Sequence, residues 1–556
     1  MMMKQSLVRA LIPCLLLFLF ILPADRASAG ESALFPTASL VAGVLNQPLF
    51  PVSDAYTTND DVVIYADDGV NLEANVFIPT SGQSSYPAII FVNSWGLNEY
   101  EYLTAAGRLA EQGYIVLSYS SRGWGKSGGL INTAGPKDMT DFSAVVDWLI
   151  TNTPVDPSAI GAAGISYGAG LSLLGAAHDP RVRAVAAMSG WGNLAEALYG
   201  QQTPRLVWGE LLTLTGELIG HPDPIINELW QNILHQQDVD TTIAWANRRS
   251  PLSVVDQLNA NGTAVYMANN WGDNLFQPNS PLRLFHQLSG PKHIDLQPGT
   301  HATVEIVGMI GDGNTHVWNN VQRWFDRYLK GQPDAMEGQP PVQMKIKLSN
   351  RYEGFADFPV PATQTRRWYL HPRTWFSQGE LSDTPYQSWF GKTEWISSWA
   401  GTLADTGIPL ASQLFEQVNV PVVAPILTLG RDRSIWFQTP KLGSPLKIRG
   451  IPETTVQVTP KSDHLQLVAY LYDMDWTGTG KLITHAPITV PETTPGQSLT
   501  LDIDLVATAY DIPAGDRLVL VIDSRDLLYK YPDQGTTSVG FEFSNNRAST
   551  LEVPAL

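Results

Sequence analysis

The sequence predicts an α/β domain followed by an all-β domain, and the order of its segments is what predicts this. Between residues 57 and 331, short apolar runs of strand length alternate with stretches of helical spacing. Strands without a polar face are typical of a parallel sheet that helices cover on both sides. Beyond about residue 340, short alternating runs separated by turn residues follow one another without a long helix, which is typical of a β-sandwich or jelly roll.

Each element of the first domain follows from its local pattern. The expected strands are two within 57–80, then 87–94, 114–121, 158–165, 182–190, 264–270 and 293–299. The expected helices lie at about 100–112, 139–150, 167–177 and 315–331, where apolar residues recur at helical spacing. An insertion at about 192–258 follows the sixth strand and contains helical patterns. We expect it to form a helical cap over the carboxyl ends of the strands.

The first 29 residues have the pattern of a secretory signal peptide. Lys4 and Arg9 precede a long apolar run, and the small residues 27–29 follow it. The apolar run is short for a membrane span. The pattern predicts cleavage before Gly30 and a secreted or periplasmic protein with no membrane segment in its mature form.

Composition excludes several kinds of chemistry. Cys14, the only cysteine, lies in the predicted signal peptide, so the mature chain has neither disulfides nor thiolate chemistry. The formal net charge is −18, and removal of the leader makes it −20, which argues against nucleic acid and anionic membranes as partners. No group of His, Cys and carboxylate residues has metal-ligand spacing, so we expect no metal and no cofactor. Oligomeric state cannot be derived from these patterns.

The mature length of about 527 residues favours more than one domain. Turn residues around 331–341 indicate a linker. The predicted organisation is an N-terminal extension at 30–56, a catalytic α/β domain at 57–331 and a C-terminal β-sandwich or jelly-roll domain, of galactose-binding-like type, at 340–556.

Two segments have the pattern G-x-S-x-G, at 125–129 and 164–168, and one at most is expected to carry a nucleophile. A nucleophile elbow needs an apolar strand, a sharp turn with serine at its tip and a helix that begins at once. Ser166 meets each condition. Ser127 does not, because loop residues lie on both sides of it.

A serine hydroxyl needs a base, and the base needs an orienting acid. In α/β-hydrolases these follow the serine in the order acid, then histidine. Asp273 follows the strand at 264–270, where the acid is expected, and His301 follows the strand at 293–299. His316 is the second candidate for the base, and Asp295 is expected to be structural.

The transition state for attack on a carbonyl also needs two N–H donors, which together form an oxyanion hole. The backbone N–H of Tyr167, at the start of a helix, is one candidate. The second is expected from the loop after the strand at 87–94, with Trp95 N–H as the candidate.

The chain resembles the X-Pro dipeptidyl-peptidase and cocaine-esterase-like (CocE/NonD) family of α/β-hydrolases. The resemblance covers roughly residues 57–556 and rests on eight features: G-I-S-Y-G (164–168), S-R-G-W-G-K-S-G-G (121–129), N-R-R-S-P (247–251), G-D-N-L-F (272–276), His301, W-F-D-R-Y-L-K-G (324–331) and the β-rich segments 469–484 and 513–524. It implies a helical cap, a jelly roll beside the site, and a triad at Ser166, Asp273 and His301.

The chain departs from that family at two positions. Ser120 stands where an Asp usually precedes the Arg-Gly pair, and Trp95 stands where the peptidase and cocaine-esterase branches place an oxyanion-hole tyrosine. Either the indole or the backbone N–H of Trp95 could take over that role. An aminopeptidase also needs a carboxylate for the substrate amine, and Glu210, Glu217 and Glu228 are the cap candidates, although charges on surface helices are usually solvated.

Three functions remain open from the sequence. The first is an acyl esterase that acts on small-molecule ester substrates, and the second is an X-prolyl dipeptidyl-peptidase that acts on peptides. The third is a non-catalytic protein that binds a carbohydrate or a cell-surface ligand through its C-terminal domain. The intact Ser, Asp and His favour the first two.

Overall fold

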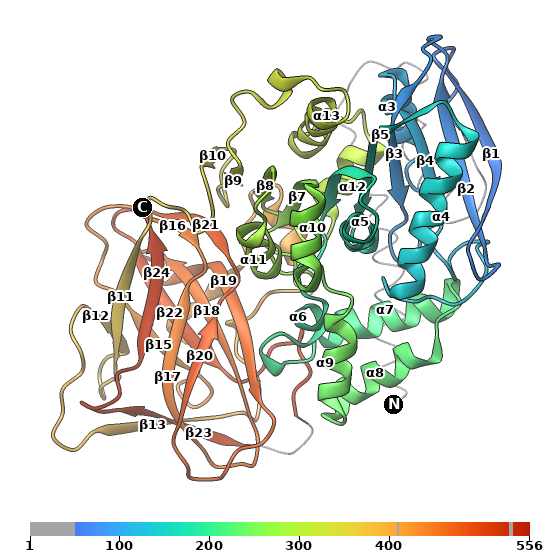
Figure 1. Cartoon of the computed structure of the whole chain (residues 1–556). Coiled ribbons are helices and arrows are strands. Elements are labelled where there is room, and N and C mark those ends of the chain that lie inside the picture. The colour runs from blue at the N-terminus through green and yellow to red at the C-terminus, as the bar shows by residue number, and fades with distance from the viewer. Residues whose placement is uncertain (1–49, 409–410, 533–536) are drawn as a thin grey trace.

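The computed structural model describes residues 50–408, 411–532 and 537–556, which form an α/β domain and an all-β domain (Figure 1). The predicted signal peptide and nearly all of the predicted N-terminal extension lie outside the described residues. A mostly parallel sheet in the first domain and mostly antiparallel strands in the second confirm the predicted order of an α/β domain and an all-β domain.

The α/β domain is built on a ten-stranded sheet in the order β1-β2-β4-β3-β5-β6-β7-β8-β9-β10. Strands β4, β3 and β5 to β9 run parallel, whereas β1, β2 and β10 pair antiparallel at the two edges. The strands are β1 (Tyr56–Tyr65), β2 (Asn71–Pro79), β3 (Tyr86–Val92), β4 (Ile115–Tyr119), β5 (Val155–Ile165), β6 (Val182–Met188), β7 (Ala264–Asn270), β8 (Lys292–Gln297), β9 (Val342–Lys345) and β10 (Tyr352–Phe355).

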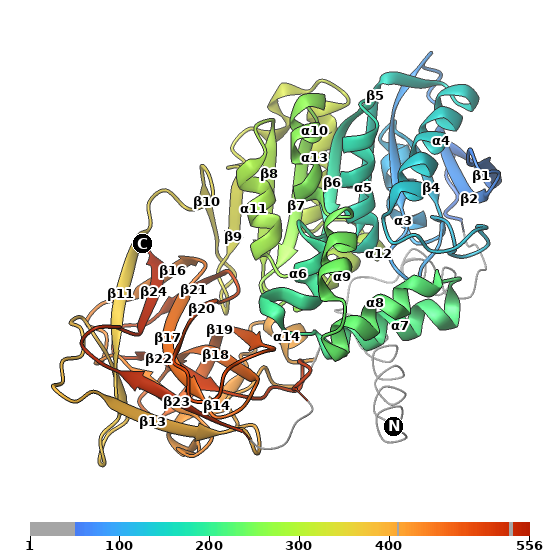
Figure 2. The same ribbon diagram turned by 60° about the horizontal axis from the view of Figure 1, so that its bottom comes forward.

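Helices cover both faces of this sheet, as apolar strands without a polar face require. Along β3, Ile90 and Val92 pack into one core and Ile89 and Phe91 into the other. Helices α4, α5, α10 and α11 cover the first face, and α3, α12 and α13 the second (Figure 2). Their bounds are α3 (Leu103–Glu111), α4 (Pro136–Asn152), α5 (Tyr167–His178), α10 (Val255–Asn261), α11 (Asn279–Gln287), α12 (Thr303–Ile310) and α13 (His316–Tyr328).

The insertion after β6 forms a helical cap at the carboxyl ends of the strands, as predicted (Figure 2). Its elements are α6 (Leu194–Tyr199), η2 (Gly200–Gln202), α7 (Leu206–Ile219), α8 (Pro224–His235), α9 (Val239–Asn247) and η3 (Pro251–Val254). None of the described helices is both long and apolar enough to span a bilayer.

The C-terminal domain is all-β apart from short helical turns, and its interior is a large apolar core. The finer jelly-roll topology stays a prediction. Its elements are β11 (Gln364–His371), β12 (Gly379–Ser382), β13 (Lys392–Ser397), α14 (Ala411–Glu416), β14 (Val423–Pro425), η5 (Ile426–Thr428), β15 (Ile435–Gln438), β16 (Leu446–Gly450), β17 (Glu453–Pro460), β18 (Leu465–Met474), β19 (Thr479–Val490), β20 (Leu499–Asp504), β21 (Thr508–Ile512), β22 (Arg517–Asp523), β23 (Ser538–Phe543) and β24 (Thr550–Ala555).

One run of residues lies in a different sheet from the one expected. The sequence predicts that the C-terminal domain begins at 340, but β9 pairs parallel to β8 and β10 pairs with β9, so both strands belong to the first sheet. The short turn η4 (Pro333–Met336) precedes β9. An alternating pattern identifies a strand and not the sheet that it joins. The predicted domain limits as a whole stay a prediction.

The second domain lies against the part of the first that carries the candidate site. The guanidinium of Arg205, at the start of α7, lies 4.9 Å from the ring centroid of Tyr529. Beside Asp273, a Cβ built on Gly272 would lie 2.9 Å from the Cβ of Gln413 on α14 of the second domain. The all-β domain thus supports both the cap and the loop that carries Asp273.

Candidate active site

The strand-to-helix turn at Ser166 has the geometry of a nucleophile elbow. Ser166 lies between β5 and α5 with φ 56° and ψ −115°, an uncommon conformation for a residue other than glycine. A Cβ on Gly164 would lie 2.4 Å from the carbonyl carbon of Gly168, and one on Gly168 would lie 2.1 Å from the carbonyl oxygen of Val92. The turn therefore needs glycine at both positions, which is the physical basis of the G-x-S-x-G pattern.

The structure brings Ser166, His301 and Asp273 together in one chain of hydrogen bonds. Nε2 of His301 lies 2.7 Å from the hydroxyl of Ser166, and Nδ1 lies 2.8 Å from Oδ2 of Asp273. Residues 135 and 28 positions apart in the sequence thus meet at the carboxyl edge of the sheet. This is the arrangement that activates a serine as a nucleophile.

The acid and the base are each held from several sides. Asp273 is fully buried, and its Oδ1 accepts the backbone N–H groups of Leu275 and Phe276 at 2.9 and 2.8 Å. The rings of Trp208 and Phe276 contact the imidazole of His301 edge to face, with centroid distances of 5.3 and 5.0 Å. Packing thus fixes the ring plane that the hydrogen bonds require.

The two candidate oxyanion donors belong to Tyr167 and Trp95, which line the same cavity as Ser166. Tyr167 is the first residue of α5, where helical N–H groups have no partner within the helix. Trp95 follows β3, and its indole N–H donates to the carbonyl of Leu212 at 3.1 Å and to the hydroxyl of Thr215 at 3.2 Å, both on α7. The indole is therefore used to hold the cap, and of the two Trp95 donors only the backbone N–H remains a candidate.

A cavity of about 130 Å³ opens beside Ser166 and extends under the cap. Its walls are aromatic and aliphatic, with Trp191, Trp230 and Trp245 among them. Thr133, Thr213 and Thr242 add hydroxyl groups, and none of the described residues in the lining is acidic or basic. An uncharged, apolar group fits these walls, because an unpaired charge in such surroundings is costly.

The cap carboxylates considered as amine ligands lie outside this lining. Glu217 and Glu228 are exposed to solvent. Glu210 is half-buried, and its Oε1 accepts the indole N–H of Trp230 at 3.3 Å. In the described part of the chain, none of the three lines the cavity.

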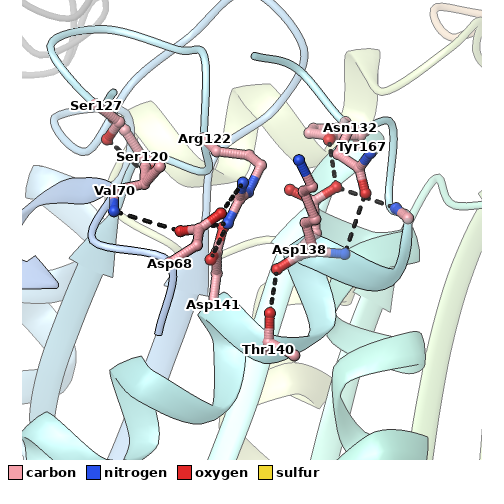
Figure 3. A network of polar contacts seen from close by, with 12 residues as sticks. Asp68, Val70, Ser120, Arg122, Ser127, Asn132, Asp138, Thr140, Asp141 and Tyr167 are labelled. Carbon is pink, nitrogen blue, oxygen red and sulfur yellow. Dashed lines mark hydrogen bonds and ion pairs between the residues drawn. The ribbon is translucent and has the colours of Figure 1, made fainter. Parts of the chain in front are cut away.

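Ser127, the serine of the other G-x-S-x-G pattern, holds backbone segments together (Figure 3). The hydroxyl of Ser127 donates to the carbonyl of Ser120 at 2.8 Å and accepts the N–H of Glu73 at 2.9 Å. In the same loop the buried guanidinium of Arg122 binds Asp141 and Asp68. This loop is built to hold strands and helices together.

The second histidine candidate belongs to another buried cluster. The carboxylate of Asp295 lies 3.3 Å from Nε2 of His316 and 2.9 Å from Nε2 of His293, and it also accepts the hydroxyl of Tyr266 at 2.6 Å. Burial alone would raise the pKa of Asp295, but the two histidines outweigh it and hold that pKa well below its ordinary value. Asp295 is thus structural, as expected from the sequence.

Asp295→Asn is expected to destabilise the protein at pH 7 and to matter less in acid. A carboxyl group whose pKa is lower in the folded than in the unfolded state stabilises the fold above its unfolded pKa of about 4, and that contribution is lost as the pH falls toward the folded value. Thermal melting of both proteins at pH 7 and pH 3.5 measures the difference. Equal differences at the two pH values would contradict this account.

No group of three or more His, Cys, Asp or Glu residues within the described ranges is arranged to hold a metal ion.

The sequence did not reveal Trp208 and Phe276 beside His301, nor the aromatic walls of the cavity. Tryptophans in helical patterns carried no signal that distinguishes core packing from a substrate cavity.

Comparison with known proteins assigns both domains to one family. A family model for the X-Pro dipeptidyl-peptidase (S15 family) matches residues 68–303, and one for the X-Pro dipeptidyl-peptidase C-terminal non-catalytic domain matches residues 334–551. Fold and matches together define a serine hydrolase of the α/β-hydrolase type. More narrowly, this chain belongs to the X-Pro dipeptidyl-peptidase-like family, and its fold is similar to that of a CocE/NonD family hydrolase.

Solved structures share the architecture over nearly the whole chain. A CocE/NonD family hydrolase from Staphylococcus aureus has a TM-score of 0.70 at 14% identity, covering 90% of this chain and 94% of that one. An aminopeptidase from a Thaumarchaeota archaeon also has 0.70, at 15% identity, covering 96% and 100%. An alpha-amino acid ester hydrolase has 0.67, at 15% identity, covering 92% and 99%. Identities this low establish the fold alone.

Curated relatives match over a shorter segment. The uncharacterized protein YcjY of Escherichia coli is 32% identical over 144 residues, which are 23% of this chain and 47% of that protein. The uncharacterized protein PA2218 of Pseudomonas aeruginosa is 35% identical over 121 residues, which are 21% of this chain and 33% of that protein. This chain thus matches less than half the length of either relative.

Proposed function

We propose that this chain is an acyl esterase that works through an acyl-serine intermediate. Ser166 attacks the ester carbonyl while His301 accepts its proton, and Asp273 stabilises the imidazolium that forms. The backbone N–H groups of Tyr167 and Trp95 hold the developing oxyanion. His301 then protonates the leaving group, and a water molecule activated by the same histidine releases the acid.

The cavity is the observation that favours an esterase over a dipeptidyl-peptidase. A substrate that carries a free amine next to its acyl group needs a carboxylate for that amine, and the described lining residues supply none. An ammonium group in such a cavity would lose its hydration without a partner. The substrate is therefore an ester whose acyl group is apolar and uncharged.

A matched pair of substrates tests this proposal. Phenyl esters of 3-phenylpropionate and of phenylalanine differ only in the amine, and we expect kcat/KM to be at least about 100-fold higher for the neutral ester, which corresponds to about 2.7 kcal/mol. Ala-Pro nitroanilide should be cleaved poorly. Efficient cleavage of the anilide, or a preference for the phenylalanine ester, would support a dipeptidyl-peptidase or an amino-ester hydrolase.

Export of the chain belongs to the same proposal and rests on the pattern of residues 1–29. The amino-terminal sequence of the exported protein tests it, with Gly30 as the expected first residue. An uncut chain that begins at Met1 would contradict it.

A further inference from the structure

A buried acidic side chain lies directly behind the proposed oxyanion hole. Glu101 and Tyr102 end the loop between β3 and α3, and both are only 1 to 2% exposed. Within the described part of the chain, no Lys or Arg forms an ion pair with Glu101. An unpaired carboxyl group at such depth needs another physical explanation.

Glu101 and Tyr102 contact both sides of the candidate site. The N–H of Ser94 donates to Oε2 of Glu101 at 2.6 Å, and the hydroxyl oxygen of Ser94 lies 2.7 Å from Oε1. The same hydroxyl oxygen lies 2.9 Å from the carbonyl oxygen of Ile165, whose own N–H donates to the hydroxyl of Tyr102 at 2.9 Å. Ser94 precedes Trp95 and Ile165 precedes Ser166, so one buried network joins the oxyanion loop to the nucleophile elbow.

The number of protons in this network indicates whether Glu101 is protonated. The hydroxyl of Ser94 has one proton, but both the carbonyl of Ile165 and an ionised Glu101 would need it. If Glu101 is a neutral acid, it donates its own proton to the Ser94 hydroxyl, which then donates to Ile165. The N–H of Ser94 still has Oε2 as its acceptor. Only in the neutral form does a proton lie both between the Ser94 hydroxyl and Oε1 of Glu101 and between that hydroxyl and the carbonyl of Ile165.

Burial also favours the neutral form of the Glu101 carboxyl group. It raises the pKa of Glu101 to about 7, although the hydrogen bonds from Ser94 and Tyr102 act in the opposite direction. The titratable group that faces Glu101 is the hydroxyl of Tyr102, and burial raises its pKa well above the ordinary value, so it stays protonated. Glu101 is therefore the group in this network that can lose a proton near neutral pH.

We propose that Glu101 is a positioning residue that acts as a neutral acid, donating a hydrogen bond to Ser94 and thereby holding the Trp95 N–H beside Ser166. The inference rests on the proposed function, because it assigns Trp95 to the oxyanion hole. When Glu101 ionises, Ser94 loses a donor and two acceptors compete for its proton. The loop then holds the oxyanion less well, and kcat falls on the alkaline side.

The test compares Glu101→Gln with Glu101→Leu on a neutral ester. A carboxamide keeps an acceptor oxygen and replaces the O–H donor of the neutral acid with an NH₂ group of two donors, and it does not ionise. We expect Glu101→Gln to keep kcat at pH 7 within about 3-fold and to lose the alkaline fall of kcat. Glu101→Leu should lower kcat by about 10- to 100-fold with KM changed less than about 3-fold, a loss below that of a whole oxyanion donor.

Glu99→Gln is the matched control. Glu99 is equally buried two residues away, but its carboxylate is bonded to the hydroxyl of Ser120, so this variant should keep the wild-type pH profile. Melting curves establish that each variant is folded. If Glu101→Leu does not fold, the pH profiles of Glu101→Gln and the wild type decide alone.

Two results would overturn the inference. One is a Glu101→Gln variant as impaired as Glu101→Leu, and the other is an alkaline fall of kcat that persists unchanged in Glu101→Gln. Both differ from a failure of the proposed function, in which the wild type itself would not cleave esters and a serine-reactive probe would not label Ser166.

Discussion

Ser166→Ala is expected to lower kcat/KM for a neutral ester by on the order of 10⁵-fold, because no other group in the chain of hydrogen bonds can attack the carbonyl. Some rate above that of water should remain, since the oxyanion donors and the cavity still bind the substrate. The measurement is kcat/KM at pH 7.5 with carefully purified protein. KM should change much less than kcat, because the hydroxyl contributes little to binding.

Ser127→Ala is the matched control for this variant, since it removes a hydroxyl from the same pattern of residues. Ser127 bonds to the backbone of Ser120 and Glu73, so its loss should cost about 1 kcal/mol of stability and leave kcat/KM within about 3-fold. Retained activity in Ser166→Ala, or its loss in Ser127→Ala, would mean that the wrong serine had been assigned.

Arg122→Met is expected to lower the stability of the α/β domain by about 3 to 5 kcal/mol. The guanidinium is 2% exposed and binds Asp141, itself 1% exposed, through Nε at 2.7 Å and Nη2 at 2.6 Å (Figure 3). It also reaches Asp68 at 3.1 Å. Burial raises the pKa of Asp141 and Arg122 opposes this rise, so the methionine variant leaves a buried carboxyl group without its partner.

Urea denaturation of the full-length protein, monitored by tryptophan fluorescence, measures this loss. Arg283→Met is the control, because Arg283 and its partner Glu196 are each 41% exposed and such pairs contribute at most about 1 kcal/mol. Similar losses in the two variants would show that burial does not determine the strength of the Arg122 interaction.

The triad was predictable because the α/β-hydrolase fold sets both the chain order of its three residues and the local structure around each of them. The turn at Ser166 needs glycines that leave a visible pattern, and Asp273 and His301 follow strands whose apolar runs are clear in the sequence. A choice between histidines was possible because His301 lies in a loop after β8, whereas His316 begins a helix.

Other features depend on contacts between distant segments, which no local pattern reveals. Whether the indole of Trp95 faces the substrate or the cap depends on α7, more than 100 residues away. The network of Glu101 depends likewise on Ile165, which is brought there by β5. The sheet that β9 joins is decided by pairing with β8 and not by its own alternation.

Covalent labelling of the active serine determines whether Ser166 is the nucleophile of a working esterase. The wild type and Ser127→Ala would be treated with a fluorophosphonate probe, digested and analysed by mass spectrometry, with Ser166→Ala as the blank. We expect one adduct per chain, on the peptide that contains Ser166, and none in Ser166→Ala. An adduct on another residue, or no adduct on folded wild-type protein, would contradict it.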